Sequence, residues 1–294
     1  MKKINGNSRS YKIFSIIVLI ILALLFLFPL YWIITGAIKT PKAINAKTPQ
    51  WFPLEVTSRN FEVLFSKRSA PLFEIGPLTG PTVPAAIRWL LNTVFMAVSA
   101  MLLTCLTAAM AGYALAKKRF TGRGILFSLI VAAMALPKQV VLLPLIREMS
   151  ALGLYNTIWA VIFPTVGWPF GVFLMKQFAE GIPGEMLEAT RINGASELRT
   201  FTSVVVPMIK PGIGALAIFT FISSWNDYFL QLIMLSKNVN YTISIGIATM
   251  QAENSTDFGL IMAGAALAAV PIIIVFLLFQ KYFTKGITMG AVKG

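Results

Sequence analysis

Long apolar segments decide most of what this chain can fold into. A helix needs about 20 predominantly apolar residues to cross the hydrocarbon core of a bilayer. We read six such segments, over roughly residues 13–38, 89–116, 124–146, 157–176, 209–235 and 258–283. Because a bilayer core accepts only helices or closed barrels, the sequence predicts an all-α integral membrane protein with six membrane-spanning helices. We expect residues 1–294 to form a single transmembrane domain.

The composition supports this class and excludes several kinds of chemistry. Charged residues make up 12% of the chain, whereas about a quarter is typical of soluble domains. There is no histidine, which excludes imidazole catalysis and histidine-ligated metals. Cys105 is the single cysteine, so no intrachain disulfide can form, and we interpret it as a small buried apolar residue.

Two of the apolar segments have unusual ends. Pro137, Lys138 and Gln139 interrupt the third segment, which predicts a short span followed by an interfacial or re-entrant piece near residues 140–149. The basic N-terminus and the apolar run after it resemble a signal peptide. That run is longer than such a region and lacks a small-residue cleavage site, so we interpret it as an uncleaved first span.

The distribution of Lys and Arg predicts the orientation, because cytoplasmic loops carry an excess of both. The stretch KKRFTGR at residues 117–123 is the strongest cytoplasmic anchor, and Lys2, Lys3, Lys285 and Lys293 lie on the same side if the N-terminus is inside. We therefore predict cytoplasmic N- and C-termini and a cytoplasmic tail at 284–294. The basic residues of loop 39–88 weaken the count, but long loops follow the rule poorly. We expect that loop to be a folded extracytoplasmic cap.

The net charge of +14 does not indicate a nucleic-acid partner. Such proteins gather their charge on one soluble face, whereas here the basic residues lie in short loops between apolar runs. The phosphate-cradling pattern G-x-x-x-x-G-K-[ST] is absent, so the chain does not bind ATP in that way. Lys138, Lys210 and Asp227 lie toward the ends of the spans, and intramembrane proton relays are unsupported.

The polar cluster SSWNDYF, residues 223–229, lies within the fifth span. Its aromatic and polar side chains can stack on a sugar and hydrogen-bond to it, or can anchor a helix end at the membrane interface. A candidate substrate path therefore includes Trp225, Asn226, Asp227 and Tyr228, together with Asn92. The small-residue stretches AAMAGYALA, IGALAIF and IMAGAALAA indicate close helix packing.

The segment GEMLEATRINGASELRTFTSVVVP, residues 184–207, is charged although its neighbours are apolar. Glu185 and Glu188 are predicted in the first turn of a helix, where carboxylates are favoured. Gly194 interrupts the pattern and predicts two short helices with a bend. A loose amphipathic stripe is expected from five residues: Leu187, Ala189, Ile192, Ala195 and Leu198. These features indicate a helical hairpin on the cytoplasmic face, and a solvated surface loop is the alternative.

The spacing within this segment resembles the EAA motif of ATP-binding-cassette importer permeases: E-A-A, three residues, Gly, nine residues, then I-x-L-P. Glu188, Ala189, Gly194 and Pro207 match it. Thr190 replaces the second alanine, and its hydroxyl puts close packing there in doubt. The wider chain is similar to the second permease of maltose-like systems, through YALAKKRFTGR, LPKQVVLLPLIREMSALGLYNT, TRINGAS, FISSWNDYF and KGITMGAVKG.

This resemblance implies a type I importer permease architecture in a bacterial inner membrane. It implies that segment 183–207 is a coupling segment for a separate ATPase, with Glu188, Ala189, Thr190, Gly194, Ala195 and Pro207 as its site residues. The partners that it implies are a homologous second permease, two ATPase copies that bind ATP and Mg²⁺, an extracytoplasmic solute-binding protein and the lipid bilayer. It implies no cofactor and no catalytic residue in this chain.

Other functions remain open from the residues alone. Within transport, the basic residues of the outer loop and Lys138 point weakly to an anionic saccharide or a sugar phosphate. An ion-coupled secondary carrier is disfavoured by the sparse carboxylates in the spans, and a membrane-embedded enzyme by the absence of histidine and of paired carboxylates. The leading prediction is a sugar or oligosaccharide importer permease.

Overall fold

The computed structural model describes residues 9–75, 77–253 and 257–291, and these residues are mostly helical. The chain divides into two compact units. Unit 1 comprises Met1–Ser69 and Ile247–Ala269, and unit 2 comprises Ala70–Gly246 and Val270–Gly294. Lys2, Lys3 and Lys293, used above for orientation, lie outside the described residues. The tail at 284–294 continues a helix as far as residue 291.

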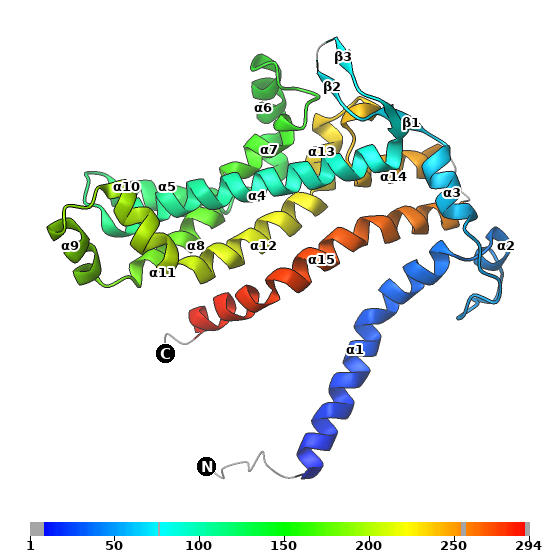
Figure 1. Ribbon diagram of the computed structural model, residues 1–294, viewed down its shortest axis with the longest axis horizontal. Helices are drawn as coiled ribbons and strands as arrows, with labels where there is room; N and C mark the ends of the chain where they lie inside the picture. The colour runs from blue at the N-terminus through cyan, green and yellow to red at the C-terminus, as the bar shows by residue number, and fades with distance from the viewer. Residues whose placement is uncertain (1–8, 76, 254–256, 292–294) are drawn as a thin grey trace. The chain divides into compact units, whose positions relative to one another are not determined.

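Four helices form the centre of unit 2: α4 (Ala85–Lys117), α7 (Trp159–Val166), α8 (Pro169–Glu180) and α12 (Lys210–Asn226). α4 lies against the other three (Figure 1). A Cβ atom added to Gly112 of α4 would lie 2.6 Å from the backbone of α8 at Met175 and Lys176. The small residues therefore let the helices approach closely, as the sequence predicted.

Several of the predicted spans are broken. By length and composition, three described helices can each cross a membrane, and up to six spans exist if each bent pair counts as one. α5 (Arg123–Ala133) and α6 (Lys138–Ala151) bend by 105°, which matches the predicted interruption after residue 136. α7 and α8 bend by 41° at Gly167 and Trp168. The fourth predicted segment, 157–176, is therefore a bent pair rather than one straight helix, because Pro169 has no N–H to continue the ladder of α7.

The fifth predicted span is also discontinuous. α12 ends at Asn226, Asp227 lies between the helices, and α13 (Tyr228–Met234) begins after it. The Asp227 carboxylate accepts a hydrogen bond from the Leu230 N–H at 3.3 Å. Asp227 is thus the N-cap of α13, so the polar cluster SSWNDYF contains a helix break rather than a continuous helix.

Unit 1 contains α1 (Arg9–Ala37), α2 (Pro41–Ile44), α3 (Arg59–Ser66) and the first part of α15 (Phe258–Ala291). None of the apolar window of α1 is buried within the protein, as expected for a helix whose solvent is lipid. The fully buried Asn60 fixes the end of α1 by donating to the carbonyls of Ala37 and Lys39, at 2.9 Å each.

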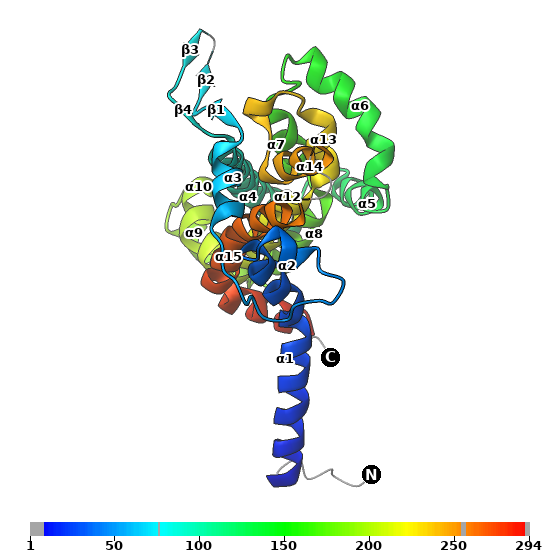
Figure 2. The ribbon, with the colours of Figure 1, turned by 90° about the vertical axis from the view of Figure 1, so that its right-hand side faces the viewer.

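Residues 39–84 fold into short elements, and residues 85–88 of the predicted cap form the start of α4. After α2 and α3, β1 (Ser69–Pro71) pairs with β4 (Thr82–Pro84), and β2 (Glu74–Ile75) pairs antiparallel with β3 (Leu78–Thr79) in the register Glu74 to Thr79 (Figure 2). The sequence predicted a folded cap here but no strands. These strands are too short to carry a periodic signal.

Two further elements were not predicted: the 3-10 turn η2 (Asn238–Asn240) and the short apolar helix α14 (Ile243–Glu253). Trp89 of α4 is fully buried, and its indole N–H donates to the Asn238 side chain at 3.0 Å. A Cβ added to Gly246 would lie 2.0 Å from the Trp89 ring. Glycine is therefore required where α14 meets α4.

Candidate functional site

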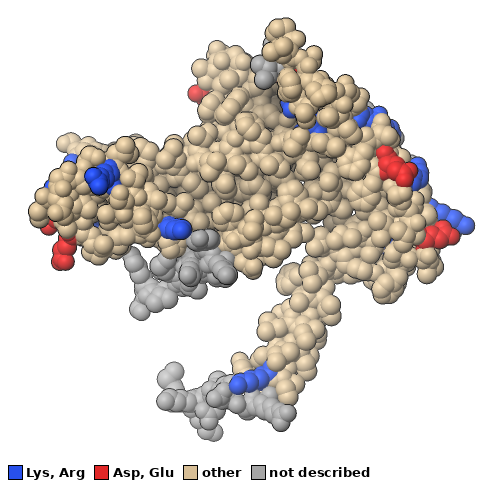
Figure 3. Space-filling model, in the orientation of Figure 1, with Lys and Arg blue, Asp and Glu red and all other residues tan. Residues whose placement is uncertain are grey.

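The segment with the EAA spacing forms one end of unit 2 (Figure 1). It contains α9 (Gly184–Ile192), α10 (Glu197–Thr200), the π-turn η1 (Phe201–Val205) and α11 (Val206–Met208). Gly194 lies between α9 and α10 with φ of 70°, a left-handed conformation that glycine adopts without steric cost. The predicted pair of short helices with a bend at Gly194 is confirmed. Charged side chains gather at this end of the unit (Figure 3).

The outer face of this segment is both charged and apolar. Glu185 lies in the first turn of α9, as predicted, whereas Glu188 lies one turn later. Glu188 and Ala189 are exposed, and Glu188 forms no ion pair or hydrogen bond with the residues that the structure describes. Its carboxylate is available to a partner.

The predicted amphipathic stripe was wrong. Leu187 is buried, but Ile192 and Leu198 are 86% and 70% exposed. Leu187 and Ile192 are five residues apart in α9 and therefore point to different sides of that helix, and Leu198 lies beyond the bend at Gly194, in α10. Ile192 lies one turn after Glu188 in α9, so its exposed side chain adds apolar surface to the side of the helix that carries the free carboxylate. Nothing in the spacing of residues separates these leucine and isoleucine positions from core positions.

A network of charged residues fixes the segment to the end of α4. The Glu197 carboxylate pairs with Lys118, lies 3.6 Å from the Arg191 guanidinium and accepts a hydrogen bond from the Tyr113 hydroxyl at 3.4 Å. The hydrogen bond from Lys118 is the main cause that lowers the pKa of Glu197 below its ordinary value. Lys117 donates to the carbonyls of Glu180 and Ile182. Glu197 was not among the predicted site residues.

The remaining residues of the motif lie around the bend. The Thr190 hydroxyl accepts a hydrogen bond from Thr200 at 3.1 Å. Ala195 is half-buried, and its N–H donates to the Thr190 carbonyl at 3.0 Å. Pro207 lies in α11, directly before the 78° bend that leads into α12. The motif therefore defines the hinge between the charged segment and a long apolar helix.

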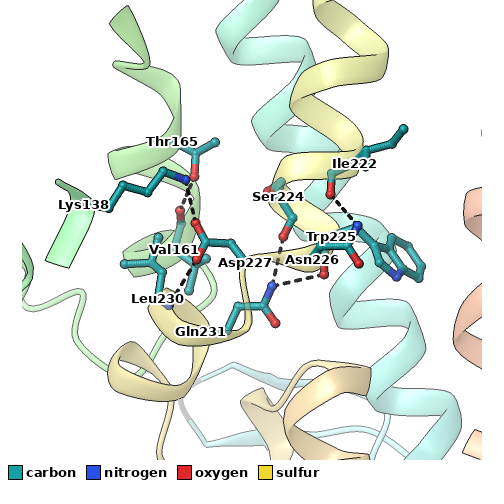
Figure 4. Close-up of polar contacts among 10 residues, drawn as sticks. All are labelled: Lys138, Val161, Thr165, Ile222, Ser224, Trp225, Asn226, Asp227, Leu230 and Gln231. Carbon is teal, nitrogen blue, oxygen red and sulfur yellow. Dashed lines mark hydrogen bonds and ion pairs between the residues drawn. The ribbon is translucent and has the colours of Figure 1, made fainter. Parts of the chain in front are cut away.

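A second candidate site is a cavity of about 520 Å³ within unit 2. It lies where three helices are broken, between α5 and α6, between α7 and α8, and between α12 and α13. Lys138 at the start of α6 and Asp227 after α12 meet across it, with 3.1 Å between the Lys138 ammonium nitrogen and the Asp227 carboxylate oxygen (Figure 4). Aromatic and polar side chains complete the lining, among them Trp168, Phe170, Phe229, Thr165, Ser223 and Ser224.

Of the five residues predicted for a substrate path, Asp227 lines this cavity and the other four do not. Trp225 is buried against Phe221, with ring centroids 5.5 Å apart, and Figure 4 shows it pointing away from Asp227. Asn226 donates to the carbonyl of Ile222 in its own helix at 2.9 Å. Tyr228 is 39% exposed.

Asn92 lies away from the cavity, near the turn that precedes α14. Its side-chain amide donates to the carbonyls of Val239 and Tyr241, at 2.8 and 2.9 Å, and fixes the turn before α14. Sequence reasoning missed Trp168, Ser223 and Ser224 as lining residues of the cavity, although SSWNDYF contains the two serines. The helix breaks bring these residues together, and of the three breaks the one near Lys138 was predicted.

The model of the "Binding-protein-dependent transport system inner membrane component" family matches residues 106–289. The arabinooligosaccharides transport system permease protein AraQ of Bacillus subtilis is 30% identical over 97% of this chain and 96% of its own length. AraQ of Halalkalibacterium halodurans is 37% identical, over 70% of this chain and 74% of its own.

Solved structures agree on the fold. A chain of a bacterial ABC transporter involved in the import of the acidic polysaccharide alginate aligns with a TM-score of 0.73. It is 24% identical, and the alignment covers 94% of this chain and 98% of that one. The family match spans the charged hinge and the cavity, and the fold agrees along nearly the whole chain. This protein therefore belongs to the binding-protein-dependent transport system inner membrane components, the permease subunits of ATP-binding-cassette importers, in which a separate subunit hydrolyses ATP.

Proposed function

We propose that this chain forms half of the translocation pathway of an ATP-driven importer for a sugar or oligosaccharide. Its relatives include permeases named for arabinooligosaccharides and, at 28% identity over 98% of this chain, the melibiose/raffinose/stachyose import permease MelC of Bacillus subtilis. The observation that carries the transport role is the hinged segment around Gly194, which presents the free Glu188 carboxylate beside exposed apolar side chains.

This segment docks on an ATPase subunit. A partner that buries Ile192 and Leu198 removes apolar surface from water, and a basic group on that partner pairs with Glu188. The network of Glu197 with Lys118 and Arg191 connects the docked segment to α4. A movement of the ATPase is thereby transmitted to the core helices of unit 2 rather than lost in a flexible loop.

The proposal includes a membrane topology. The segment 183–207 and the basic stretch 117–123 lie on one side of the membrane, because Lys118 contacts Glu197. The excess of Lys and Arg identifies that side as the cytoplasm. Six spans then result if each bent helix pair crosses once, with N- and C-termini in the cytoplasm and the folded segment 39–88 outside, in a bacterial inner membrane.

The implied assembly contains this chain, a homologous second permease, two ATPase copies and an extracytoplasmic solute-binding protein. ATP and Mg²⁺ bind to the ATPases, and the charged hinge couples their state to the state of the pathway. Because the sugar and ATP then act on the same two states, each changes the apparent affinity for the other.

The test uses two carboxylates of one helix. Glu185 and Glu188 are both exposed in α9. Glu188→Ala in the purified complex is expected to reduce ATP-driven uptake into proteoliposomes and to lower the amount of ATPase that co-purifies. Glu185→Ala serves as the matched control and is expected to change both by much less. Normal uptake by the Glu188→Ala complex would contradict the coupling role.

A further inference from the structure

We propose that the cavity between the three helix breaks is a binding site for an uncharged sugar residue, and that the Lys138–Asp227 pair sets this preference. The proposal rests on the sugar-transport function and assigns to this subunit a direct contact with the substrate. Four observations carry it: the position of the cavity, the Ser224 hydroxyl, the aromatic lining and the balance of charge.

The position is the first observation. Broken helices leave backbone N–H and C=O groups without helical partners, and inside a membrane such backbone is tolerated where it lines a cavity. Three breaks of unit 2 converge on this one cavity. Its volume of about 520 Å³ lies within the range typical of small-molecule sites.

The Ser224 hydroxyl is the second observation. Ser224 lines the cavity and is 2% exposed, and its hydroxyl forms no hydrogen bond with any described residue. Its carbonyl, by contrast, accepts from the Gln231 side chain at 2.9 Å (Figure 4). Buried hydroxyls normally have a partner. The hydroxyl oxygen itself has less than 1 Å² of accessible surface. Rotation of the short serine side chain toward the cavity presents it to a sugar hydroxyl, which can donate and accept at the same time.

The aromatic lining is the third observation. Trp168 and Phe170 lie with ring centroids 5.0 Å apart beside the break between α7 and α8, and Phe229 is exposed at the start of α13. A mostly apolar wall with a few placed polar groups is the usual construction of a ligand site. A pyranose or furanose ring presents C–H groups on its face and hydroxyls at its edge, and this wall matches both.

The charge is the fourth observation and determines the class of sugar. Among the described residues that line the cavity, Lys138 and Asp227 are the charged ones, and they pair at 3.1 Å. Their charges cancel, so an acidic sugar would meet the Asp227 carboxylate without a free cation to balance it. The pair still offers N–H donors and carboxylate acceptors to neutral hydroxyls. Lys138 considered without its partner points to an anionic substrate. Its pairing with Asp227 favours an uncharged sugar instead.

The first experiment measures the charge of the cavity without any sugar. Ser223 also lines the cavity and is partly exposed. In a Cys105→Ala background of the full transporter complex, Ser223→Cys is labelled with a cationic and an anionic thiosulfonate reagent of similar size. Adding Asp227→Asn is expected to raise the ratio of anionic to cationic labelling at least about fivefold, because one positive charge is then uncompensated at short range.

Ser150→Cys provides the matched control, because Ser150 is exposed in α6 and does not line the cavity. Its labelling ratio is expected to stay unchanged when Asp227→Asn is added. A ratio at residue 223 that is equally insensitive would overturn the assignment of the Lys138–Asp227 pair as the charge balance of the cavity.

The second experiment identifies the occupant. Proteoliposomes are first screened for uptake of arabinotriose, raffinose and digalacturonate, and the transported sugar is then used to protect residue 223 from labelling. The expected result is protection by an uncharged sugar, with Ser224→Ala raising the protecting concentration about tenfold, which is the usual effect of one lost hydrogen bond. Asp227→Asn is expected to shift protection toward digalacturonate.

The outcomes separate the two proposals. Uptake of an uncharged sugar without protection of residue 223 would place the substrate elsewhere and overturn this site while leaving the transport function intact. Uptake of digalacturonate but of neither neutral sugar would overturn the charge argument. Uptake of none of the three would count against the sugar-transport function itself, and the sugar assignment of the cavity would fall with it.

Discussion

The Thr200 hydroxyl donates a hydrogen bond of 3.1 Å to the Thr190 hydroxyl, which in turn donates to the Leu187 carbonyl at 2.8 Å. This chain of bonds joins α9 and α10 across the bend at Gly194. Thr190 occupies the position at which the EAA pattern has its second alanine, and the sequence left the packing there in doubt. The structure resolves that doubt, because the extra hydroxyl has a buried partner: Thr200 is 3% exposed.

Thr190→Ala is expected to destabilise the hinge although it restores the family pattern. It leaves the buried Thr200 hydroxyl without its acceptor, at a cost of about 1–3 kcal/mol. The double variant Thr190→Ala with Thr200→Val removes both polar groups and is expected to recover most of that loss. A double-mutant cycle on the local opening free energy, measured by amide hydrogen exchange in α9 and α10, tests this. Strictly additive effects would contradict it.

Gly194→Ala is expected to cost about 1–2 kcal/mol, because an L-residue is strained at φ of 70°. A Cβ there meets nothing within 4 Å, so the cost is one of backbone conformation alone. Gly194→Asn is expected to lose less, since asparagine tolerates this region. Gly184→Ala is the control, because it also has open space but lies in α9 without positive φ. Thermal unfolding of the complex distinguishes the three variants. Equal losses of stability for alanine at positions 194 and 184 would contradict the role of the backbone conformation.

The Glu197 carboxylate makes the stability of the folded protein depend on pH. Its hydrogen bond from Lys118 holds its pKa below the ordinary value of 4.5. A lowered carboxyl pKa contributes stability that is present above the ordinary value and is lost as the pH falls through the lower, folded value. Glu197→Gln is therefore expected to lower stability at pH 7 by less than about 1 kcal/mol, since the side chain is largely exposed and water screens the pair.

This difference between the original protein and the Glu197→Gln variant is expected to shrink toward zero as the pH is lowered below 4.5. Unfolding midpoints measured across that range give the comparison, with Glu185→Gln as the control for an exposed glutamate of α9. A difference that grew on acidification would show that the network does not stabilise the folded segment.

Gly112→Ala is expected to disrupt the crossing of α4 and α8. Its Cβ would lie 2.6 Å from the α8 backbone, and overpacking of this kind costs typically about 1–3 kcal/mol. Gly171→Ala is the matched control at the same interface, where the nearest atom is the Ala108 Cβ at 3.3 Å and a small shift suffices. Expression level and thermal stability of the two complexes are the readouts, and an equally mild effect at both positions would count against the packing model.

Local patterns identified what depends on nearby residues. Apolar length alone marked α1, α4 and α15, because the lipid environment requires long uninterrupted helices. Gly194 marked the bend between α9 and α10, since its conformational freedom is a property of one residue. The breaks at residues 167–168 and at Asp227 were not predicted, although Pro169 and the helix-capping Asp227 mark them locally. Apolar composition alone does not distinguish a broken segment from a continuous one.

The sequence by itself thus determined the membrane class, the charged hinge and the family resemblance. Only the tertiary structure decided which polar residues meet. Four of the predicted substrate-path residues do not line the cavity: Asn92, Trp225, Asn226 and Tyr228. Lys138, which lies 89 residues before Asp227 in the chain, forms an ion pair with it there. The physical reason is that a hydrogen bond or ion pair depends on distance in space. That distance is set by where the helices break and how closely glycines let them pack, neither of which the spacing of residues along the chain records.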